Sequence, residues 1–366
     1  METTSLYVHI PFCIDICSYC DFCKVYYKEK LVDDYLEQLE IEANQLKIAK
    51  PLKTIYIGGG TPSALSLKQL EKLLEILKKF VTNELLEYSI ELNIESTNQE
   101  KLKLLKKYQL NRLSIGVQTF NQEIMKKLNR HHQNIDINKI IQDAKVIGFD
   151  NISIDLIYGH RDQTIDQLNE DLKKINELQI QHISCYSLIL EEHTKLWIDN
   201  YQPIEEQIEG DMADCISKTL QSYGFDQYEI SNYAKKGFES KHNQVYWKYQ
   251  NYYSLGAGAT SKIDDTIYNA SKNVFGYAKG KFTKNIEVKE KKDIMFEHIM
   301  MSLRLVQGLD ILDFNQRYDV DFIEIYKDTI KKYQDKSILV IENNYIFVAK
   351  KYLNYLHTIL LDFMDE

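Results

Sequence analysis

This 366-residue sequence lacks both long apolar runs and an excess of positive charge. No uninterrupted apolar stretch approaches the roughly 18 residues that suggest a membrane span. The residues before the first strand-like run leave no room for a signal peptide. We therefore expect a cytoplasmic protein with no transmembrane segment, in which thiols stay reduced. Acidic residues (54) outnumber basic ones (45), and the net charge of -9 argues against nucleic acid as a partner.

Proline is also scarce, with only 4 residues against 26 tyrosines, a bias that we interpret as compositional drift. The remaining composition is that of a folded protein, with 44% hydrophobic and 27% charged residues. A chain of this length can bury a large core and is expected to form one large domain and a smaller one. We expect a barrel domain over residues 1–204, a flanking region over 205–284 and a C-terminal domain over 285–366.

The first half of the chain alternates short strand-like runs with amphipathic helical patterns, which is typical of parallel βα units. Three helices begin with a predicted capping box, at Ser66, Thr97 and Thr164. Six strands are predicted, over residues 5–10, 54–57, 88–92, 113–117, 152–157 and 182–190. Six such units favour an α/β fold with a partial TIM-type (β/α)6 barrel. A doubly wound sheet remains the alternative, because this periodicity does not say whether the sheet curls.

Polar residues stand where several of these strands end. Glu91 and Asn93 end the third strand, Gln118 ends the fourth, and Asp155 lies near the end of the fifth. In a TIM-type barrel the reacting groups lie at the carboxyl ends of the strands, so we expect these side chains to share one site. The C-terminal domain is predicted to be winged-helix-like and α+β, with two strands joined at residues 343–344.

Four of the six cysteines fall within one short stretch, as Cys13, Cys17, Cys20 and Cys23. A zinc site is the weakest interpretation, because no second C-x2-C or H-x3-5-H pair follows later in the chain. A ferredoxin-type cluster on the last three cysteines lacks the fourth cysteine and the proline that normally follow. The third interpretation uses Cys13, Cys17 and Cys20 at C-x3-C-x2-C, which leaves one iron of a 4Fe-4S cluster open.

The C-x3-C-x2-C spacing after an apolar strand resembles the signature of radical S-adenosylmethionine (SAM) proteins. The string Tyr7-x-His9-Ile10-Pro11-Phe12-Cys13, with Tyr19 before Cys20, is similar to the HemN/HemW family within them, which contains oxygen-independent coproporphyrinogen III oxidases and haem chaperones. The resemblance implies a 4Fe-4S cluster whose open iron binds the amino and carboxylate groups of SAM. Electron transfer from the cluster can then split SAM into methionine and a 5′-deoxyadenosyl radical.

The same resemblance implies which residues hold SAM. The glycine run at 58–60 follows the second strand, where glycines let backbone groups approach a polar ligand closely. The implied SAM residues are Tyr7, Tyr19, Gly59, Gly60, Thr61, Glu91, Gln118, Arg130 and Asp155. The sequence departs from the family pattern at Ile94, at His160-Arg161 and at Thr260, which stands where a histidine is usual.

The motif His242-Asn243-x-x-Tyr246-Trp247 resembles one that the haem chaperones associate with haem binding. A histidine beside lysine and aromatic residues is more often a packing residue, but His is also a usual axial ligand of haem iron. On this resemblance we expect a haem chaperone with haem at His242. Its expected partners are a haem-acceptor protein and an electron donor for the cluster. The alternatives are a coproporphyrinogen III oxidase and an iron-sulfur electron carrier without SAM.

Overall fold

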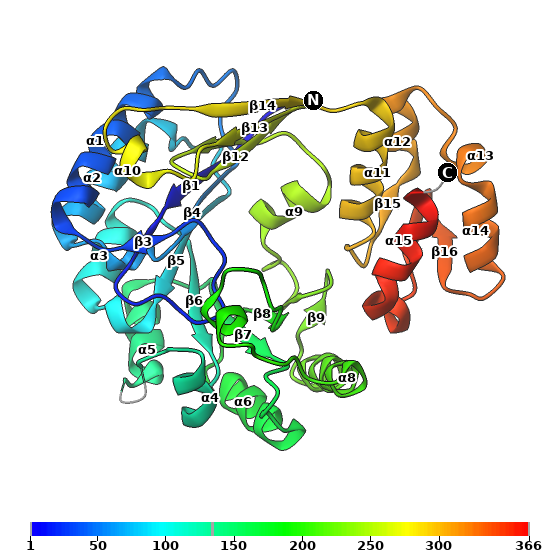
Figure 1. The fold of residues 1–366 in the computed structure, drawn as a ribbon, viewed down its shortest axis with the longest axis horizontal. Helices are drawn as coiled ribbons and strands as arrows, with labels where there is room; N and C mark the ends of the chain where they lie inside the picture. The colour runs from blue at the N-terminus through cyan, green and yellow to red at the C-terminus, as the bar shows by residue number, and fades with distance from the viewer. Residues whose placement is uncertain (1, 133–134, 365–366) are drawn as a thin grey trace.

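The computed structural model describes residues 2–132 and 135–364, and its largest element is a curved nine-stranded sheet (Figure 1). The order of its strands is β11-β1-β4-β5-β6-β7-β8-β10-β9. Its six central, parallel strands are β1 (Ser5–Ile10), β4 (Thr54–Gly59), β5 (Glu87–Asn93), β6 (Arg112–Gln118), β7 (Ile152–Tyr158) and β8 (His182–Ser187). The sheet has two free edges, β11 (Tyr253–Leu255) and β9 (Asp226–Gln227), so it is a partial barrel as predicted.

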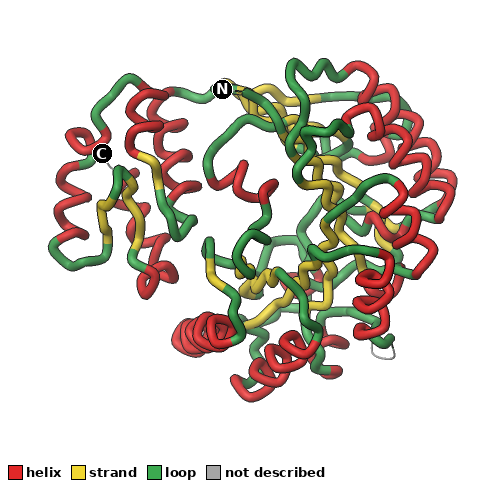
Figure 2. Tube along the Cα trace, turned by 180° about the vertical axis from the view of Figure 1, so that it is seen from behind, coloured by secondary structure: helices red, strands yellow, loops and turns green. Residues whose placement is uncertain are grey.

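Helices cover the outer, convex face of this sheet (Figures 1 and 2). They are α1 (Glu29–Gln45), α2 (Leu67–Leu77), α3 (Gln99–Lys107), α5 (Ile137–Ile147), α6 (Ile165–Glu177) and α8 (Glu206–Ser222). The capping boxes predicted at Ser66 and Thr164 are confirmed. The one predicted at Thr97 is wrong, because Asn98 caps α3 through a side-chain oxygen that accepts from the backbone N–H of Lys101 at 2.9 Å.

Strand alternation separates the two faces of the sheet. On β1, Leu6, Val8 and Ile10 are fully buried under the helices, and each such side chain contributes about 1.5–3 kcal/mol to stability. The alternate positions face the concave interior and are mostly polar, unlike the aliphatic layers that usually fill a TIM barrel. On β5 these positions are Glu87, Ser89, Glu91 and Asn93. The interior of the barrel is therefore built to receive a polar ligand.

The segment after β8 extends the sheet beyond its parallel strands. The strand predicted over residues 182–190 ends at Ser187, and β10 (Asn232–Ala234) then pairs antiparallel with β8. The short helix α9 (Lys241–Trp247) lies on the open side of the curved sheet (Figure 1). A second sheet is formed by β12 (Thr260–Ile263), β13 (Thr266–Ala270) and β14 (Lys284–Val288).

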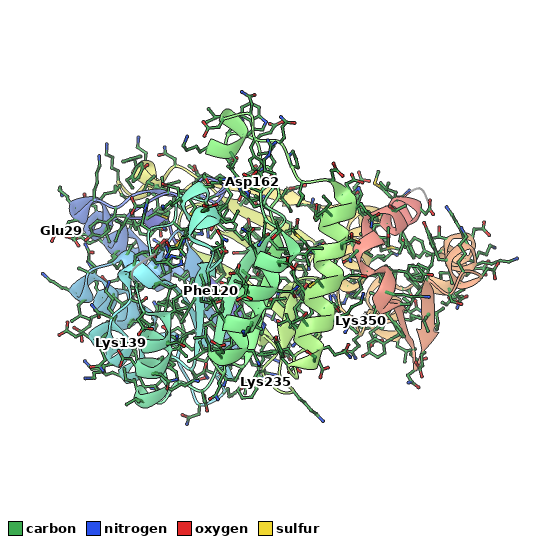
Figure 3. The ribbon with its side chains drawn as sticks, turned by 90° about the horizontal axis from the view of Figure 1, so that it is seen from below. Glu29, Phe120, Lys139, Asp162, Lys235 and Lys350 are labelled. Atoms are coloured by element: carbon green, nitrogen blue, oxygen red, sulfur yellow. The ribbon has the colours of Figure 1, made fainter. Side chains whose placement is uncertain are left out.

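The C-terminal part of the chain has its own apolar core. Its elements are α11 (Lys291–Ser302), β15 (Leu309–Asp310), α12 (Ile311–Tyr318), α13 (Phe322–Ile325), α14 (Lys327–Gln334), β16 (Leu339–Glu342), β17 (Tyr345–Val348) and α15 (Leu356–Met364). The predicted pair β16 and β17 is present, but β15 joins it as a third strand. Asn343 and Asn344 both have positive φ, as a tight hairpin turn requires. Figure 3 shows this unit, near Lys350, at one end of the row of barrel helices.

Candidate functional site

The cysteine loop between β1 and α1 is fixed at both ends. Its flanks form a short parallel pair, β2 (Phe12–Cys13) with β3 (Val25–Tyr26). Its middle is tied to the end of α4 (Gln122–Lys127), because the Ser18 hydroxyl donates to the carbonyl of Lys127 at 2.8 Å and the Asn129 amide to that of Ile16 at 2.8 Å. The loop therefore presents its cysteines from a braced backbone.

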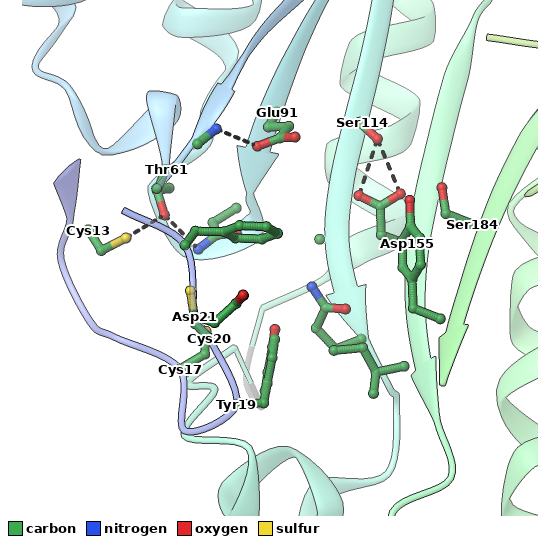
Figure 4. A pocket seen from close by; sticks show the side chains of 18 of the residues that line it. Cys13, Cys17, Tyr19, Cys20, Asp21, Thr61, Glu91, Ser114, Asp155 and Ser184 are labelled. Carbon is green, nitrogen blue, oxygen red and sulfur yellow. Dashed lines mark hydrogen bonds between the residues drawn. The ribbon is translucent and has the colours of Figure 1, made fainter. Parts of the chain in front are cut away.

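Three of the four clustered cysteines line one cavity, and the fourth does not. Cys13, Cys17 and Cys20 line a cavity of about 350 Å³ inside the barrel, which we call the main cavity (Figure 4). Cys23 lines a different cavity, and its thiol donates to the carbonyl of Lys272 at 3.5 Å. This placement separates Cys23 from the other three thiols, as C-x3-C-x2-C ligation requires.

The arrangement of the cysteines fits a cluster better than a single metal ion. Over residues 2–132 and 135–364, no three His, Cys, Asp or Glu side chains converge closely enough to share one ion. In a cubane each cysteine binds a separate iron, so the thiols stand apart. Two of the sulfur atoms accept hydrogen bonds. The Thr61 hydroxyl donates to Cys13 at 3.5 Å, and the Arg130 guanidinium donates to Cys17 at 3.6 Å. Such donors stabilise thiolate ligands.

The glycine run brings the end of β4 against the cysteine loop. A Cβ on Gly60 would lie 2.9 Å from the backbone nitrogen of Phe12 and 3.0 Å from the Cys13 sulfur. Gly59 has φ +119°, and a Cβ there would lie 2.7 Å from the ring of His9. The Thr61 backbone N–H donates to the carbonyl of Phe12 at 2.9 Å. Glycine is therefore required here by the packing of the chain itself.

Two carboxylates of the main cavity face the loop from the far side (Figure 4). Glu91 accepts from the Gly59 backbone N–H at 3.0 Å and from the Tyr56 hydroxyl at 3.0 Å. Burial, with repulsion from Asp155, raises the pKa of Glu91 to about 7. Burial also raises the pKa of Asp155, although the Ser114 hydroxyl lies 3.2 Å from each of its oxygens. Buried acids of this kind suit a cationic ligand.

Arg130 is a buried residue, not the solvated charge that an isolated helical arginine usually is. Its side chain is 3% exposed, and its guanidinium donates to the Gly116 carbonyl at 2.5 Å and lies 3.7 Å from Glu95. Burial disfavours the Glu95 charge, but His132 and Arg130 lower the pKa of that carboxyl to about 2. Glu95, which directly follows the departure from the family pattern at Ile94, is thus one ion-pair partner of Arg130.

Gln118 lies at a bulge where β6 leaves the sheet, with φ +69°. A Cβ on Gly116 would lie 3.0 Å from the Gln118 amide nitrogen and 3.2 Å from the Asn93 amide oxygen. With the Arg130 guanidinium at 3.7 Å from the same point, the absence of a side chain at Gly116 lets three polar groups converge on the cavity. Eleven of the thirteen predicted site residues line this main cavity: Cys13, Cys17, Tyr19, Cys20, Gly59, Gly60, Thr61, Glu91, Gln118, Arg130 and Asp155.

Sequence reasoning missed polar residues deeper in the main cavity. Arg112, Ser114, Ser184 and Tyr186 line it from the inner faces of β6 and β8. Arg112 is 1% exposed, and the carboxyls of Glu87 and Asp155 stabilise its charge. The signal was present as polar residues at every second position of predicted strands, which places them on one face.

A second cavity of about 290 Å³ lies on the other side of Asp21 and Phe22, which line both cavities. We call it the side cavity. Its lining residues are Tyr7, His9, Asp21, Phe22, Cys23, Tyr246, Tyr252, Gly258, Thr260 and Lys272. Tyr7, predicted to flank SAM, lies here and hydrogen-bonds His9 Nδ1 at 2.9 Å. Thr260, one of the departures from the family pattern, donates to Asn269 at 2.7 Å.

Another departure, at His160-Arg161, lies in a loop that is closed by Gln163, whose side chain accepts from the Gly159 backbone N–H.

His242 is fully buried, and both of its ring nitrogens are occupied. Nδ1 lies 2.8 Å from the Thr54 hydroxyl, Nε2 lies 2.8 Å from the Tyr246 hydroxyl, and the ring stacks on Tyr56. Burial lowers the pKa of His242 to about 3, so the imidazole is neutral. Two other residues of the His242-Asn243-x-x-Tyr246-Trp247 motif line the two cavities. Asn243 lines the main cavity, and Tyr246 lines the side cavity.

Comparisons with known proteins agree with this geometry. The Radical SAM superfamily profile matches residues 7–175, and the HemN C-terminal domain profile matches residues 290–351. The solved coproporphyrinogen III oxidase HemN of Escherichia coli superposes with a TM-score of 0.85 at 23% identity, covering 99% of this chain and 90% of that one, which shows a shared fold. In the part of the chain that the structure describes, we find no helix long and apolar enough to span a bilayer.

Curated relatives match over nearly the whole chain. The heme chaperone HemW of Lactococcus lactis is 37% identical over 96% of this chain and 94% of its own length. That of Bacillus subtilis is 36% identical over 92% of both, and that of Escherichia coli is 30% identical over 91% and 90%. Matches of this identity and coverage, on top of a three-cysteine loop at the mouth of a partial barrel, show that the chain belongs to the HemW family of radical SAM proteins.

Proposed function

We propose that the protein is a haem chaperone that binds haem and passes it to an acceptor protein. The observation that supports this most is the end-to-end similarity to relatives named heme chaperone HemW, at up to 37% identity. The similarity includes the C-terminal domain, so it is not limited to the cluster-binding barrel. The coproporphyrinogen oxidase shares the fold at lower identity and is the less favoured alternative.

We propose that Cys13, Cys17 and Cys20 hold a 4Fe-4S cluster and that SAM binds beside it in the main cavity. When bound, this pair supplies a site for one-electron chemistry. Gly59 and Gly60 line this cavity without a side chain that would fill it, and Glu91 offers a carboxylate to a cationic group. The buried acids and the cationic sulfonium and amino groups of SAM are complementary in charge. The cluster also implies an electron donor as a partner.

The test uses the full chain, purified anaerobically with its cluster reconstituted. Stoichiometric binding of ferric haem, followed by transfer of haem to apomyoglobin, is the expected result. In the same preparation, SAM should alter the EPR spectrum of the reduced cluster, which an electron carrier without a SAM site would not show. If the protein converted coproporphyrinogen III in the presence of SAM and a reductant and transferred no haem, the proposed function would change from haem chaperone to coproporphyrinogen III oxidase.

A further inference from the structure

The haem-associated motif offers its tyrosine, and not its histidine, to a ligand. His242 and Tyr246 lie one turn apart on α9 and are joined by the 2.8 Å contact between Nε2 and the tyrosine hydroxyl. His242 has no exposed surface, whereas Tyr246 lines the side cavity. An iron atom cannot reach either imidazole nitrogen without breaking a buried hydrogen bond.

The hydrogen bonds around His242 also have a direction. The Thr54 hydroxyl donates to Ser5 at 2.9 Å, so its oxygen accepts from Nδ1–H of His242. Nε2 is then the unprotonated nitrogen, and it accepts from the Tyr246 hydroxyl. The single proton of the Tyr246 phenol therefore lies in a hydrogen bond to a neutral imidazole, which fixes the position of the phenol oxygen.

The side cavity has the chemistry of a tetrapyrrole site. The aromatic rings of Tyr7, Phe22 and Tyr252 line it, and Phe22 is 64% exposed at its boundary with the main cavity. The cavity carries one acid, Asp21, and one cation, Lys272, and the cation suits a carboxylate of the ligand. Binding pockets for small molecules are mostly apolar and aromatic with a few placed polar groups, and tyrosine is an established haem ligand.

We propose that haem occupies the side cavity and that Tyr246 binds its iron, with His242 as the hydrogen-bonding partner of that tyrosine. This inference rests on the proposed haem-chaperone function and names the site and the ligand within it. On binding ferric haem, the bond between iron and the Tyr246 oxygen forms and the O–H bond of the phenol breaks. The phenol proton is released to solvent, because burial keeps the pKa of His242 at about 3 and its imidazole stays neutral, so charge and atoms balance.

The test compares ferric haem binding to the wild type, Tyr246→Phe and the matched control Tyr249→Phe. Tyr249 is a buried tyrosine on the same segment, and its hydroxyl donates to Glu297 at 2.6 Å, away from the side cavity. The wild type and the control should show the charge-transfer band and high-spin EPR signal of a ferric tyrosinate. Tyr246→Phe should lose both, and His242→Gln should keep the band at an affinity about tenfold or more lower.

The outcomes separate this inference from the function on which it rests. A wild type that binds no haem overturns both. A wild type that binds haem while Tyr246→Phe keeps the same spectrum and affinity overturns the ligand assignment alone. Loss of the haem signal in His242→Gln together with its persistence in Tyr246→Phe would overturn it in favour of histidine. Thermal unfolding of each variant identifies any that has lost its fold, and Tyr246→Phe, which keeps the ring, remains decisive.

Discussion

The two cavities on either side of Asp21 and Phe22 differ in the chemistry of their walls. The main cavity combines three cysteines with the buried carboxyls of Glu91 and Asp155, which suits a charged ligand beside a metal cluster. The side cavity has tyrosine and phenylalanine rings in its lining together with His9, one acid, Asp21, and one exposed cation, Lys272. Asp21 and Phe22 thus stand between the cavity proposed to bind SAM and the cavity proposed to bind haem.

The largest expected effect comes from removing the cysteines of the main cavity. Replacing Cys13, Cys17 or Cys20 by Ser should abolish incorporation of a 4Fe-4S cluster, because each thiolate binds its own iron. Cys23→Ser should retain the cluster, since its thiol lies in the side cavity. Iron and sulfide analysis with the visible absorption spectrum measures the difference after anaerobic reconstitution.

Cys215→Ser is the neutral control for this series, because its thiol contacts Asn169 on the outer face, at α6 and α8. If Cys23→Ser lost the cluster while Cys13→Ser kept it, the cluster would have to be assigned to the side cavity instead of the main cavity.

The second effect is the pH dependence introduced by Glu91. Its pKa rises from 4.5 to about 7 on folding, so the folded chain holds a proton that the unfolded chain releases. Stability of the apoprotein should therefore fall as the pH rises from about 4.5 to about 7, by about 3 kcal/mol at most. SAM affinity should change in the opposite direction, because the ionised carboxylate forms as the pH rises through 7.

Glu91→Gln separates these two trends. The variant should lose this part of the pH dependence in chemical denaturation of the apoprotein, and it should also bind SAM more weakly at pH 8 in calorimetry. Haem binding in the side cavity should be unchanged. Equal pH dependence in the wild type and the variant would show that another group, and not Glu91, carries the proton.

The sequence predicted the frame of the main cavity well for a physical reason. Parallel βα units bring the carboxyl ends of strands together, so Glu91, Gln118 and Asp155 meet wherever the strands are identified. The side cavity was not predictable in this way. Tyr246 and Tyr7 meet there through packing of α9 against the barrel, between segments far apart in the chain.

His242 shows another contact that the sequence could not reveal. The motif marks the residue, but its partners Thr54 and Tyr56 come from a strand almost two hundred residues earlier. A sequence pattern does not say whether both ring nitrogens of a histidine already have hydrogen-bond partners. Arg112 was missed because a charged residue at the beginning of a strand resembles a solvated end, whereas its place on the inner face of the curved sheet leaves it 1% exposed.

A pair of glycine variants should affect the two cavities reciprocally, with smaller effects than the changes above. In Gly116→Ala the new methyl group meets the amides of Gln118 and Asn93, so SAM affinity should fall by about tenfold while haem binding is retained. In Gly258→Ala it would lie 2.7 Å from Cys23, at φ +79°, so haem binding should weaken while the cluster and SAM are retained. Parallel titrations of each variant with SAM and with haem measure both effects, and a variant that weakens both ligands equally would show that the cavities are coupled.

The smallest effect on stability is expected at Phe22, the residue that both cavities share. Its ring is 64% exposed, so Phe22→Ala should change the free energy of unfolding by no more than about 0.5 kcal/mol. Haem affinity should nevertheless fall, since ring contacts of this kind contribute about 0.5–1.5 kcal/mol beyond simple burial. SAM affinity should change less, because the polar contacts of the main cavity come from the strands. If Phe22→Ala weakened SAM binding more than haem binding, Phe22 would belong to the SAM site. The proposed difference between the two cavities would then be wrong.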